Sequence, residues 1–176
     1  ENPDDPFMYF YLGKTYRLMG NDAEAIEEFK KVIALNKGDM KDRLIAEVYT
    51  ALSQLYLKMG DCKISKNYAC KAEKIAGYEI LPKYVLVTID FLEGNYKDAL
   101  VKLERILEIA ENKEREAILG EVDISQIYED IGNCKFRMND YGGAEENYKK
   151  AILLSDGKYT SHFNLGNVLF KMGRIE

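Results

Sequence analysis

A short turn signal recurs along this chain between stretches of amphipathic helix. It consists of glycine or asparagine followed by asparagine or aspartate, at Gly20-Asn21, Gly60-Asp61, Gly94-Asn95 and Asn139-Asp140. Glycine ends a helix in the left-handed conformation without strain, and asparagine is the next most tolerant residue. The asparagine or aspartate that follows is a favourable N-cap for the next helix. The sequence therefore predicts pairs of short helices, each joined by a tight turn.

The residues around each turn also repeat. If the turn glycine is numbered position 15, the units begin at Pro6, Ala46, Ile80, Ser125 and Tyr159. Position 8 is small in four of the five units, as Gly13, Ser53, Gly132 and Gly166, and is Val87 in the third unit. Position 20 is small in all four units that contain it, as Ala25, Ser65, Ala99 and Ala144. Small side chains at these positions let two paired helices approach closely, with larger residues filling the grooves beside them.

This order of small, large and aromatic residues resembles the tetratricopeptide repeat (TPR), a helix–turn–helix unit of about 34 residues. The resemblance implies an all-α, right-handed superhelical solenoid of about four and a half repeats, with nine or ten helices. The repeats are predicted at 6–39, 46–79, 80–113, 125–158 and, in part, 159–176, within a single TPR domain over 1–176 that is expected to be a fragment of a longer protein. The extra residues before Ala46 are expected to lengthen the following helix backwards, and 112–124 are expected to be helical, with a possible break at Gly120.

Composition excludes several classes of function. The net charge is −5 with both signs mixed along the chain, whereas a nucleic-acid binder needs a basic face. No apolar run is long enough to insert into a membrane. Three cysteines and one histidine, His162, provide no plausible zinc set. Reduced thiols favour a cytoplasmic location.

The sequence contains no catalytic pattern. The glycines mark turns, no phosphate-binding loop is present, and His162 occupies a position that is filled by tyrosine in other units. We therefore expect His162 to pack structurally, and the fragment to be a non-enzyme without cofactor or metal.

The TPR resemblance implies a concave groove, lined by the first helix of each unit, that receives a protein or peptide ligand. The candidate groove residues are Phe10, Lys14, Arg17, Thr50, Gln54, Tyr84, Thr88, Phe91, Glu129, Asn133, Phe136, Phe163, Asn164, Asn167 and Phe170. Aromatic rings would supply contact area and amides would pair with peptide backbone. Any single aromatic residue could instead pack between neighbouring repeats.

One TPR subtype is disfavoured. TPR domains that clamp the acidic C-termini of heat-shock chaperones carry lysine at position 5, asparagine at position 9 and asparagine at position 6 of the next unit. Asn133 and Asn164 match this pattern, but Glu129 replaces the lysine. A carboxylate clamp is therefore not expected.

Three functions remain open at this point. The first is a non-catalytic scaffold that mediates protein–protein interaction or assembly. The second is an accessory domain, because Asn2-Pro3-Asp4-Asp5-Pro6-Phe7 followed by YFYLGKTYRLMGN resembles the start of TPR arrays behind bacterial family 2 glycosyltransferase domains. The third is a peptide-sensing regulator. A fifth unit without a second helix also predicts self-association through that end.

Overall fold

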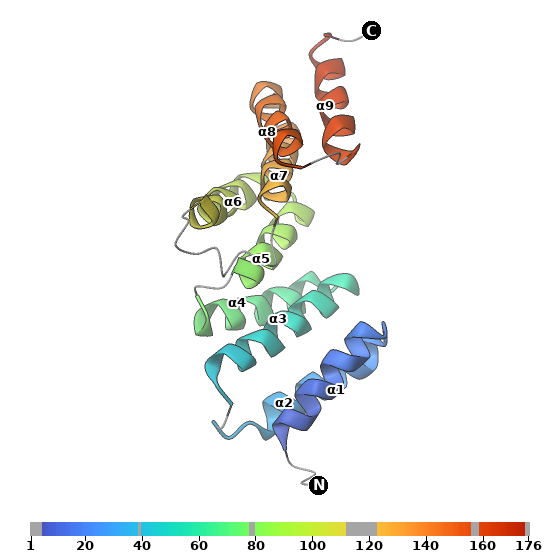
Figure 1. Ribbon diagram of the computed structural model, residues 1–176, viewed down its shortest axis with the longest axis vertical. Coiled ribbons are helices and arrows are strands. Elements are labelled where there is room, and N and C mark those ends of the chain that lie inside the picture. The colour runs from blue at the N-terminus through green and yellow to red at the C-terminus, as the bar shows by residue number, and fades with distance from the viewer. Residues whose placement is uncertain (1–4, 39, 78–79, 112–122, 156–158, 175–176) are drawn as a thin grey trace. The chain divides into compact units, whose positions relative to one another are not determined.

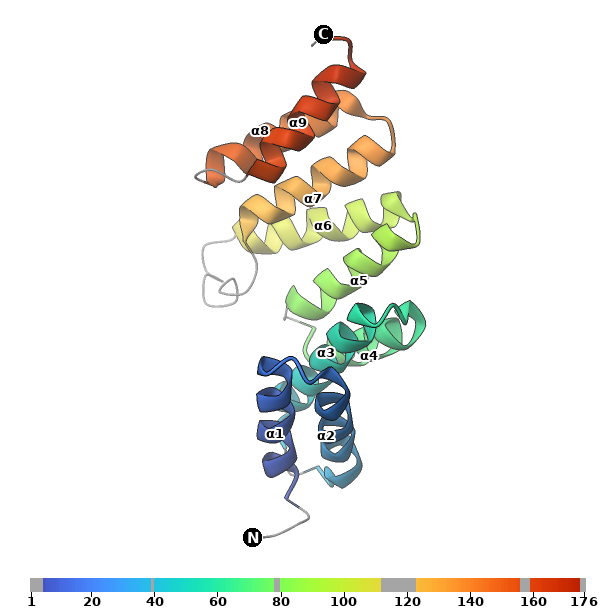
Figure 2. The same cartoon turned by 90° about the vertical axis from the view of Figure 1, so that its right-hand side faces the viewer.

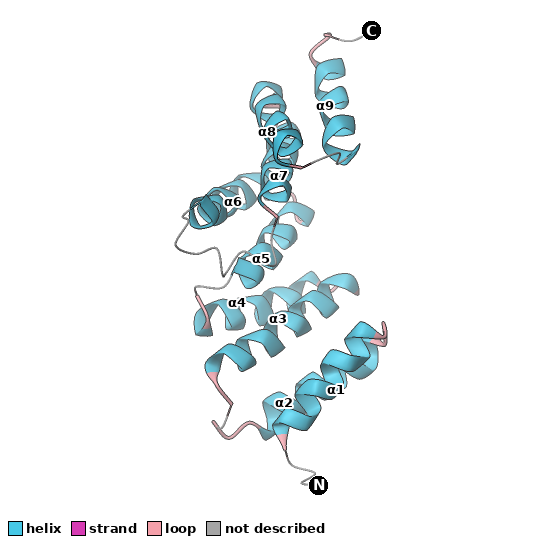
Figure 3. Cartoon of the chain, viewed as in Figure 1, coloured by secondary structure: helices cyan, strands magenta, loops and turns pink. Residues whose placement is uncertain are grey.

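The computed structural model describes residues 5–38, 40–77, 80–111, 123–155 and 159–174. These residues form nine α-helices and no strand, which confirms an all-α helical repeat (Figures 1 and 3). The helices are α1 (Pro6–Leu18), α2 (Asp22–Leu35), α3 (Asp42–Lys58), α4 (Cys62–Ile75), α5 (Ile80–Leu92), α6 (Tyr96–Glu111), α7 (Ile124–Arg137), α8 (Tyr141–Leu154) and α9 (Tyr159–Lys171).

The chain divides into two compact units, Glu1–Val85 and Leu86–Glu176. The first contains two helix pairs, α1 with α2 and α3 with α4. Its core is made of fully buried apolar side chains, among them Phe29, Val32, Val48 and Leu52. Burial of these side chains is the main favourable contribution to the folding of this unit.

In the second unit α7 pairs with α8, and α9 packs against α8 and α7 (Figure 2). Its buried side chains include Leu103, Ile106, Ile127, Tyr148 and Val168. The apolar residues that recur along each helix therefore face the neighbouring helix, as expected for an amphipathic helical repeat.

Small residues bring the paired helices together as predicted. A Cβ added to Gly13 would lie 2.8 Å from the Phe29 ring, so the ring of α2 rests directly on the α1 backbone. In the second helix pair, two small residues hold the crossing by reciprocal hydrogen bonds. The Ser53 hydroxyl donates to the Ser65 carbonyl at 2.9 Å, and the Ser65 hydroxyl donates to the Ser53 carbonyl at 2.8 Å.

The turns have the predicted backbone conformation. Gly20, Gly60, Gly94 and Gly173 have φ between 68° and 83°, and Asn139 also has a positive φ, at 62°. Backbone bonds close each helix end, for example from Gly60 N–H to the Leu57 carbonyl at 2.9 Å. The left-handed turn is therefore the device that folds each second helix back onto the first.

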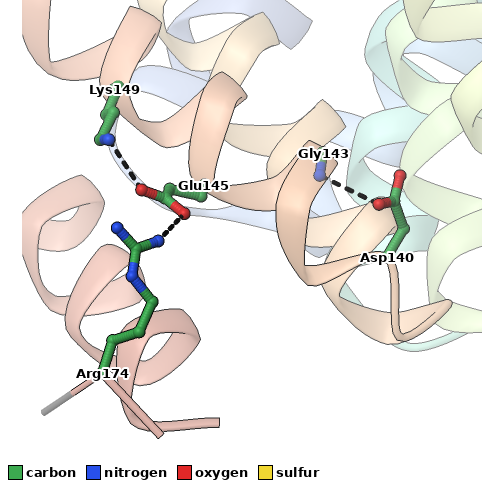
Figure 4. A network of polar contacts seen from close by, with 5 residues as sticks. All are labelled: Asp140, Gly143, Glu145, Lys149 and Arg174. Carbon is green, nitrogen blue, oxygen red and sulfur yellow. Dashed lines mark hydrogen bonds and ion pairs between the residues drawn. The ribbon is translucent and has the colours of Figure 1, made fainter. Parts of the chain in front are cut away.

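N-capping follows the prediction for the two aspartates but not for Asn21. Asp61 accepts from the Ile64 N–H at 2.9 Å. Asp140 accepts from the Gly143 N–H, also at 2.9 Å, and Figure 4 shows this second bond. Asn21 makes no side-chain capping hydrogen bond, so the prediction that its side chain caps α2 is wrong. The Asn21 carbonyl still accepts from the Ala25 N–H at 3.0 Å, which starts α2 by its backbone alone.

The insertion before the second repeat lengthens its first helix as expected. Helix α3 begins at Asp42 and has 17 residues, compared with 13 in α1. The insertion expected to be helical at 112–124 falls mostly outside the described residues, as does Gly120. Across the described residues, none of the helices is long and apolar enough to cross a membrane.

Candidate functional site

In the first unit, side chains on the facing sides of α1 and α3 pair with each other. Lys14 Nζ lies 2.7 Å from Glu47 Oε1, and Arg17 Nη1 donates to Gln54 Oε1 at 3.2 Å. The Lys14 ammonium also lies 5.2 Å from the centre of the Phe10 ring. The structure thus brings together three predicted groove residues, Lys14, Arg17 and Gln54. Their polar groups pair with other side chains of the protein.

Two predicted groove residues of the first unit are buried. Phe10 is 2% exposed and belongs to the core with Phe29 and Val32. Thr50 is 4% exposed, and its hydroxyl donates to the Ala46 carbonyl at 2.8 Å. Both side chains stabilise the packing of their helices. For Phe10 this is the alternative left open above, in which an aromatic residue packs within the protein.

The predicted groove residues of α5 are half-buried. Tyr84 lies in the first unit, whereas Thr88 and Phe91 lie in the second. The Phe91 ring packs edge-on against Tyr96 of α6, with 5.2 Å between ring centres. Asp90, which the sequence analysis did not single out, is 3% exposed and forms an ion pair with Lys102 of α6. Polar and aromatic contacts thus join α5 to α6.

In the second unit, Glu129 is a buried carboxylate that joins α7 to α9. Its side chain is 6% exposed. One oxygen, Oε2, accepts from Thr160 Oγ1 at 3.1 Å and from Ser161 Oγ at 2.8 Å, and the other, Oε1, accepts from Asn164 Nδ2 at 3.4 Å. A buried carboxylate is costly unless hydrogen bonds satisfy it. These donors therefore make Glu129 a structural link between the two helices.

The amide of Asn133 lies beside that of Asn164. Asn133 Oδ1 accepts from the Tyr148 hydroxyl at 2.9 Å and from Asn164 Nδ2 at 3.4 Å, and Asn133 Nδ2 donates to Asp130 Oδ1 at 3.3 Å. Burial raises the pKa of Tyr148 above its ordinary value, and the negative charges of Glu129 and Asp130 add to the effect. Tyr148 therefore stays protonated and donates to Asn133.

Beside these amides, α9 exposes two aromatic rings. Phe163 is 70% exposed and Phe170 is 66% exposed. Asn167 lies one helical turn after Phe163 and is also exposed. Phe136 of α7 is half-buried, with its ring packed edge-on against Tyr141 at 5.6 Å between centres. We refer to Asn133, Phe136, Phe163, Asn164, Asn167 and Phe170 as the α7–α9 face.

Several contacts at this end of the second unit have no signal in the repeat pattern. Glu145 of α8 lies between two cations, 2.7 Å from Lys149 and 2.5 Å from Arg174 (Figure 4). Ser161 and Thr160 donate to Glu129, although neither was among the predicted groove residues. His162 is exposed rather than packed, which corrects the sequence-based expectation. None of these roles follows from residue type alone.

Among the described residues, no three histidine, cysteine, aspartate or glutamate side chains cluster in a way that could hold a metal ion. The α7–α9 face offers aromatic area and amide groups, which suit the side chains and backbone of a protein segment.

Family models for the tetratricopeptide repeat match residues 6–39, 46–77 and 125–157. A human protein, Tetratricopeptide repeat protein 16, is 24% identical over 175 residues, which cover 99% of this chain and 16% of that protein. The chain thus spans a small part of that relative's length.

Solved structures share the fold. The apo form of RapI superposes with a TM-score of 0.80 at 20% identity, covering 96% of this chain and 49% of that one. YrrB, described as a TPR protein with an unusual peptide-binding site, superposes with a TM-score of 0.73 at 17% identity, covering 99% and 81%. These superpositions show the shared fold. The family-model matches cover more than half of the chain, and they show that the chain belongs to the tetratricopeptide repeat family.

Proposed function

We propose that this chain is a non-catalytic scaffold that binds a segment of a partner protein on the α7–α9 face. The observation that carries the proposal is the pair of exposed rings, Phe163 and Phe170, on the same side of α9 as the exposed amide of Asn167. Exposed aromatic rings are favourable anchors, because they bury a large apolar area at a small cost in side-chain entropy.

The polar groups of this face favour a peptide backbone as ligand. Asn164 Nδ2 is shared between Glu129 and Asn133 at 3.4 Å to each, which is a long distance for an N–H···O hydrogen bond. A peptide carbonyl could therefore compete for this amide while the hydroxyls of Thr160 and Ser161 still donate to Glu129. The aromatic rings on either side of Asn167 would then contact alternate side chains of the peptide.

The first unit is a weaker candidate for the same role. Lys14 and Arg17 bind Glu47 and Gln54, and Phe10 is buried. A ligand would have to break these contacts before it could use the groups.

The test is selection of peptides against the chain followed by affinity measurement. A random 12-residue peptide library displayed on phage is panned against the wild-type chain, and enriched peptides are measured by fluorescence anisotropy. We expect the double variant Phe163→Ala/Asn167→Ala to bind them at least about 10-fold more weakly, because two anchors are lost. Leu18→Ala in α1, where the leucine is 85% exposed, is the matched control and is expected to bind normally.

Two outcomes would contradict the proposal. One is that enriched peptides bind the double variant as tightly as the wild type. The other is that panning enriches no peptide that binds the wild-type chain.

Two finer statements remain proposals. The first is a cytoplasmic location, supported by three free cysteines, Cys62, Cys70 and Cys134. The second is the role of accessory domain beside a glycosyltransferase, which rests on the resemblance at residues 2–21; residues 2–4 lie outside the described residues. Sequencing the native gene on both sides of these residues tests the second, since an adjoining glycosyltransferase domain with a DxD metal motif is expected.

A further inference from the structure

Helix α4 carries the highest positive charge among the helices of the described residues. Its 14 residues include four lysines and one glutamate, a net charge of +3, in a chain whose total is −5. The glutamate, Glu73, pairs with Lys83 of α5 at 3.6 Å. The N-cap Asp61 is occupied at the helix start, where it accepts from the Ile64 N–H at 2.9 Å.

Three of the lysines lie on the solvent side of α4. Spacings of four and eleven residues return to nearly the same side of an α-helix, so Lys63, Asn67 and Lys74 lie together there. Lys71 follows Asn67 by one turn, and all four side chains are exposed. We refer to Lys63, Asn67, Lys71 and Lys74 as the α4 lysine face.

Two tyrosine rings hold Lys71 in place. Its ammonium lies 5.6 Å from the ring centre of Tyr49 and 5.3 Å from that of Tyr68. The lysines at the same repeat position of α2 and α8, Lys31 and Lys150, also lie over a tyrosine of the first helix, at 5.1 and 5.5 Å. The placement of this ammonium is therefore a recurring feature of the repeats.

The lysines of α2 and α8 also have carboxylate partners one turn earlier. The pairs are Lys31 with Glu28 at 2.8 Å and Lys150 with Glu146 at 2.7 Å. In α4 the residues at these two acidic positions are Tyr68 and Asn67, which carry no charge. Because Lys71 is already ordered by the rings, a carboxylate from another molecule can pair with it at a small cost in side-chain entropy.

The size of the α4 lysine face favours a short acidic ligand. Nucleic-acid binding draws its affinity from many phosphate contacts. Recognition of an anionic membrane surface uses clusters of about four to eight basic residues. Lys63 and Lys74 are separated by about 16 Å along the helix axis. An extended peptide covers this distance with about five residues.

We propose that the α4 lysine face binds an acidic segment of a partner protein, whose carboxylates pair with Lys63, Lys71 and Lys74. The complementary charges specify the partner and orient it along α4. This face lies in the first unit, and the proposal does not depend on peptide binding at the α7–α9 face.

The test uses a model acidic peptide as the probe. A blocked peptide of five Glu-Ser repeats is titrated into the 15N-labelled chain and followed by backbone amide shifts. The salt concentration is about 0.1 M, where a Debye length of about 10 Å limits the response to nearby charges. We expect saturable shifts in residues 63–74, and no such shifts with the uncharged peptide of five Gln-Ser repeats.

Charge reversal locates the site. We expect Lys63→Glu/Lys74→Glu to weaken binding of the Glu-Ser peptide at least about 10-fold. Lys97→Glu/Lys171→Glu is the matched control, because it changes the net charge equally at exposed lysines of the second unit. It is expected to bind the peptide normally. Circular dichroism verifies that both variants are folded.

A second variant gives α4 the charge pattern of α8. Asn67→Glu places a carboxylate four residues before Lys71, as Glu146 is placed before Lys150. The new pair favours the helix, so the fold is expected to be kept. We expect the Glu-Ser peptide to bind this variant at least about threefold more weakly, and Asn67→Gln to bind it normally.

Four results would overturn the proposal. The first is the absence of peptide-induced shifts from α4. The second is binding that Lys63→Glu/Lys74→Glu leaves unchanged, or that the matched control weakens equally. The third is loss of binding in Phe163→Ala/Asn167→Ala, which would move the site to the α7–α9 face. The fourth is tighter binding of α4 to ten-nucleotide oligothymidylate or to phosphatidylserine vesicles than to the peptide, which would make a nucleic acid or a membrane the occupant.

Discussion

Small residues at the helix crossings have different roles in different repeats. A Cβ added to Gly132 would lie 2.7 Å from the Tyr148 ring, whereas no heavy atom of the described residues would lie within 4 Å of a Cβ on Gly166. The repeat pattern assigns the two glycines the same position and hence the same role. Only their neighbours distinguish them, and substitution by alanine can measure the difference.

We expect Gly132→Ala to lower the free energy of unfolding by about 1–3 kcal/mol, because the new methyl group overlaps the Tyr148 ring. Gly166→Ala is the matched control. It is expected to raise the free energy of unfolding by up to about 1 kcal/mol, because alanine favours a helix more than glycine does. Urea denaturation measures both. Equal effects of the two changes would show that the register of α7 on α8 is wrong.

The buried thiol of Cys134 makes stability depend on pH in the alkaline range. Burial raises the pKa of this thiol from 9.0 to about 12, and the nearby Asp130 charge adds to the effect. Above about pH 9 the unfolded state therefore releases a proton that the folded state keeps. The contribution of this thiol to the free energy of unfolding is fully present below about pH 9 and is lost as the pH rises toward about 12.

The expected result is that the stability advantage of the wild type over Cys134→Ala falls by about 1–2 kcal/mol between pH 9 and pH 11. Urea denaturation at a series of pH values measures it. A stability difference between the wild type and Cys134→Ala that stays constant over this range would exclude a thiol that stays protonated in the fold.

At the scale of elements, Glu129 decides how α9 is held. The repeat pattern predicts that Glu129 faces a ligand groove, because its position does so in the tetratricopeptide repeat. The structure instead surrounds its carboxylate with the hydroxyls of Thr160 and Ser161 and the amide of Asn164. This role requires α9 to pack beside α7, which no local pattern predicts.

We expect Glu129→Ala to loosen α9 by about 2–4 kcal/mol, because the variant loses the bonds to a charged group and leaves the Ser161 hydroxyl buried without its acceptor. Amide hydrogen exchange should then accelerate in residues 159–171. Glu146→Ala is the control, since Glu146 pairs with Lys150 at 2.7 Å on the exposed side of α8, and it is expected to leave the protection of α9 unchanged. Unchanged protection of α9 in Glu129→Ala would contradict the structural role.

At the scale of the whole chain, the two compact units have separate cores. Leu52 lies in the first unit and Leu103 in the second, and both are fully buried. The stability of repeat proteins is approximately the sum of contributions from each repeat and from its contacts with neighbouring repeats. A destabilising substitution in one unit should therefore lower the stability of that unit more than that of the other.

Leu52→Ala is therefore expected to lower the stability of α1 to α4 by about 2–5 kcal/mol, through lost burial and the cavity that remains. Protection of α7 and α8 should change far less. Leu103→Ala is expected to give the reverse result. Native-state hydrogen exchange measures the free energy of opening for each helix. Equal loss in both units for either variant would show that the chain unfolds as one cooperative body.

The sequence by itself determined the features that depend on neighbouring residues along the chain. The left-handed turns at Gly20, Gly60, Gly94 and Asn139 follow from local backbone sterics, and the helix pairs follow from apolar spacing. The tertiary structure decided which side chains of equivalent position are buried, paired or open. It placed Phe10 in the core and used Glu129 to hold α9, because burial depends on which helix lies opposite and a repeat pattern does not specify that contact.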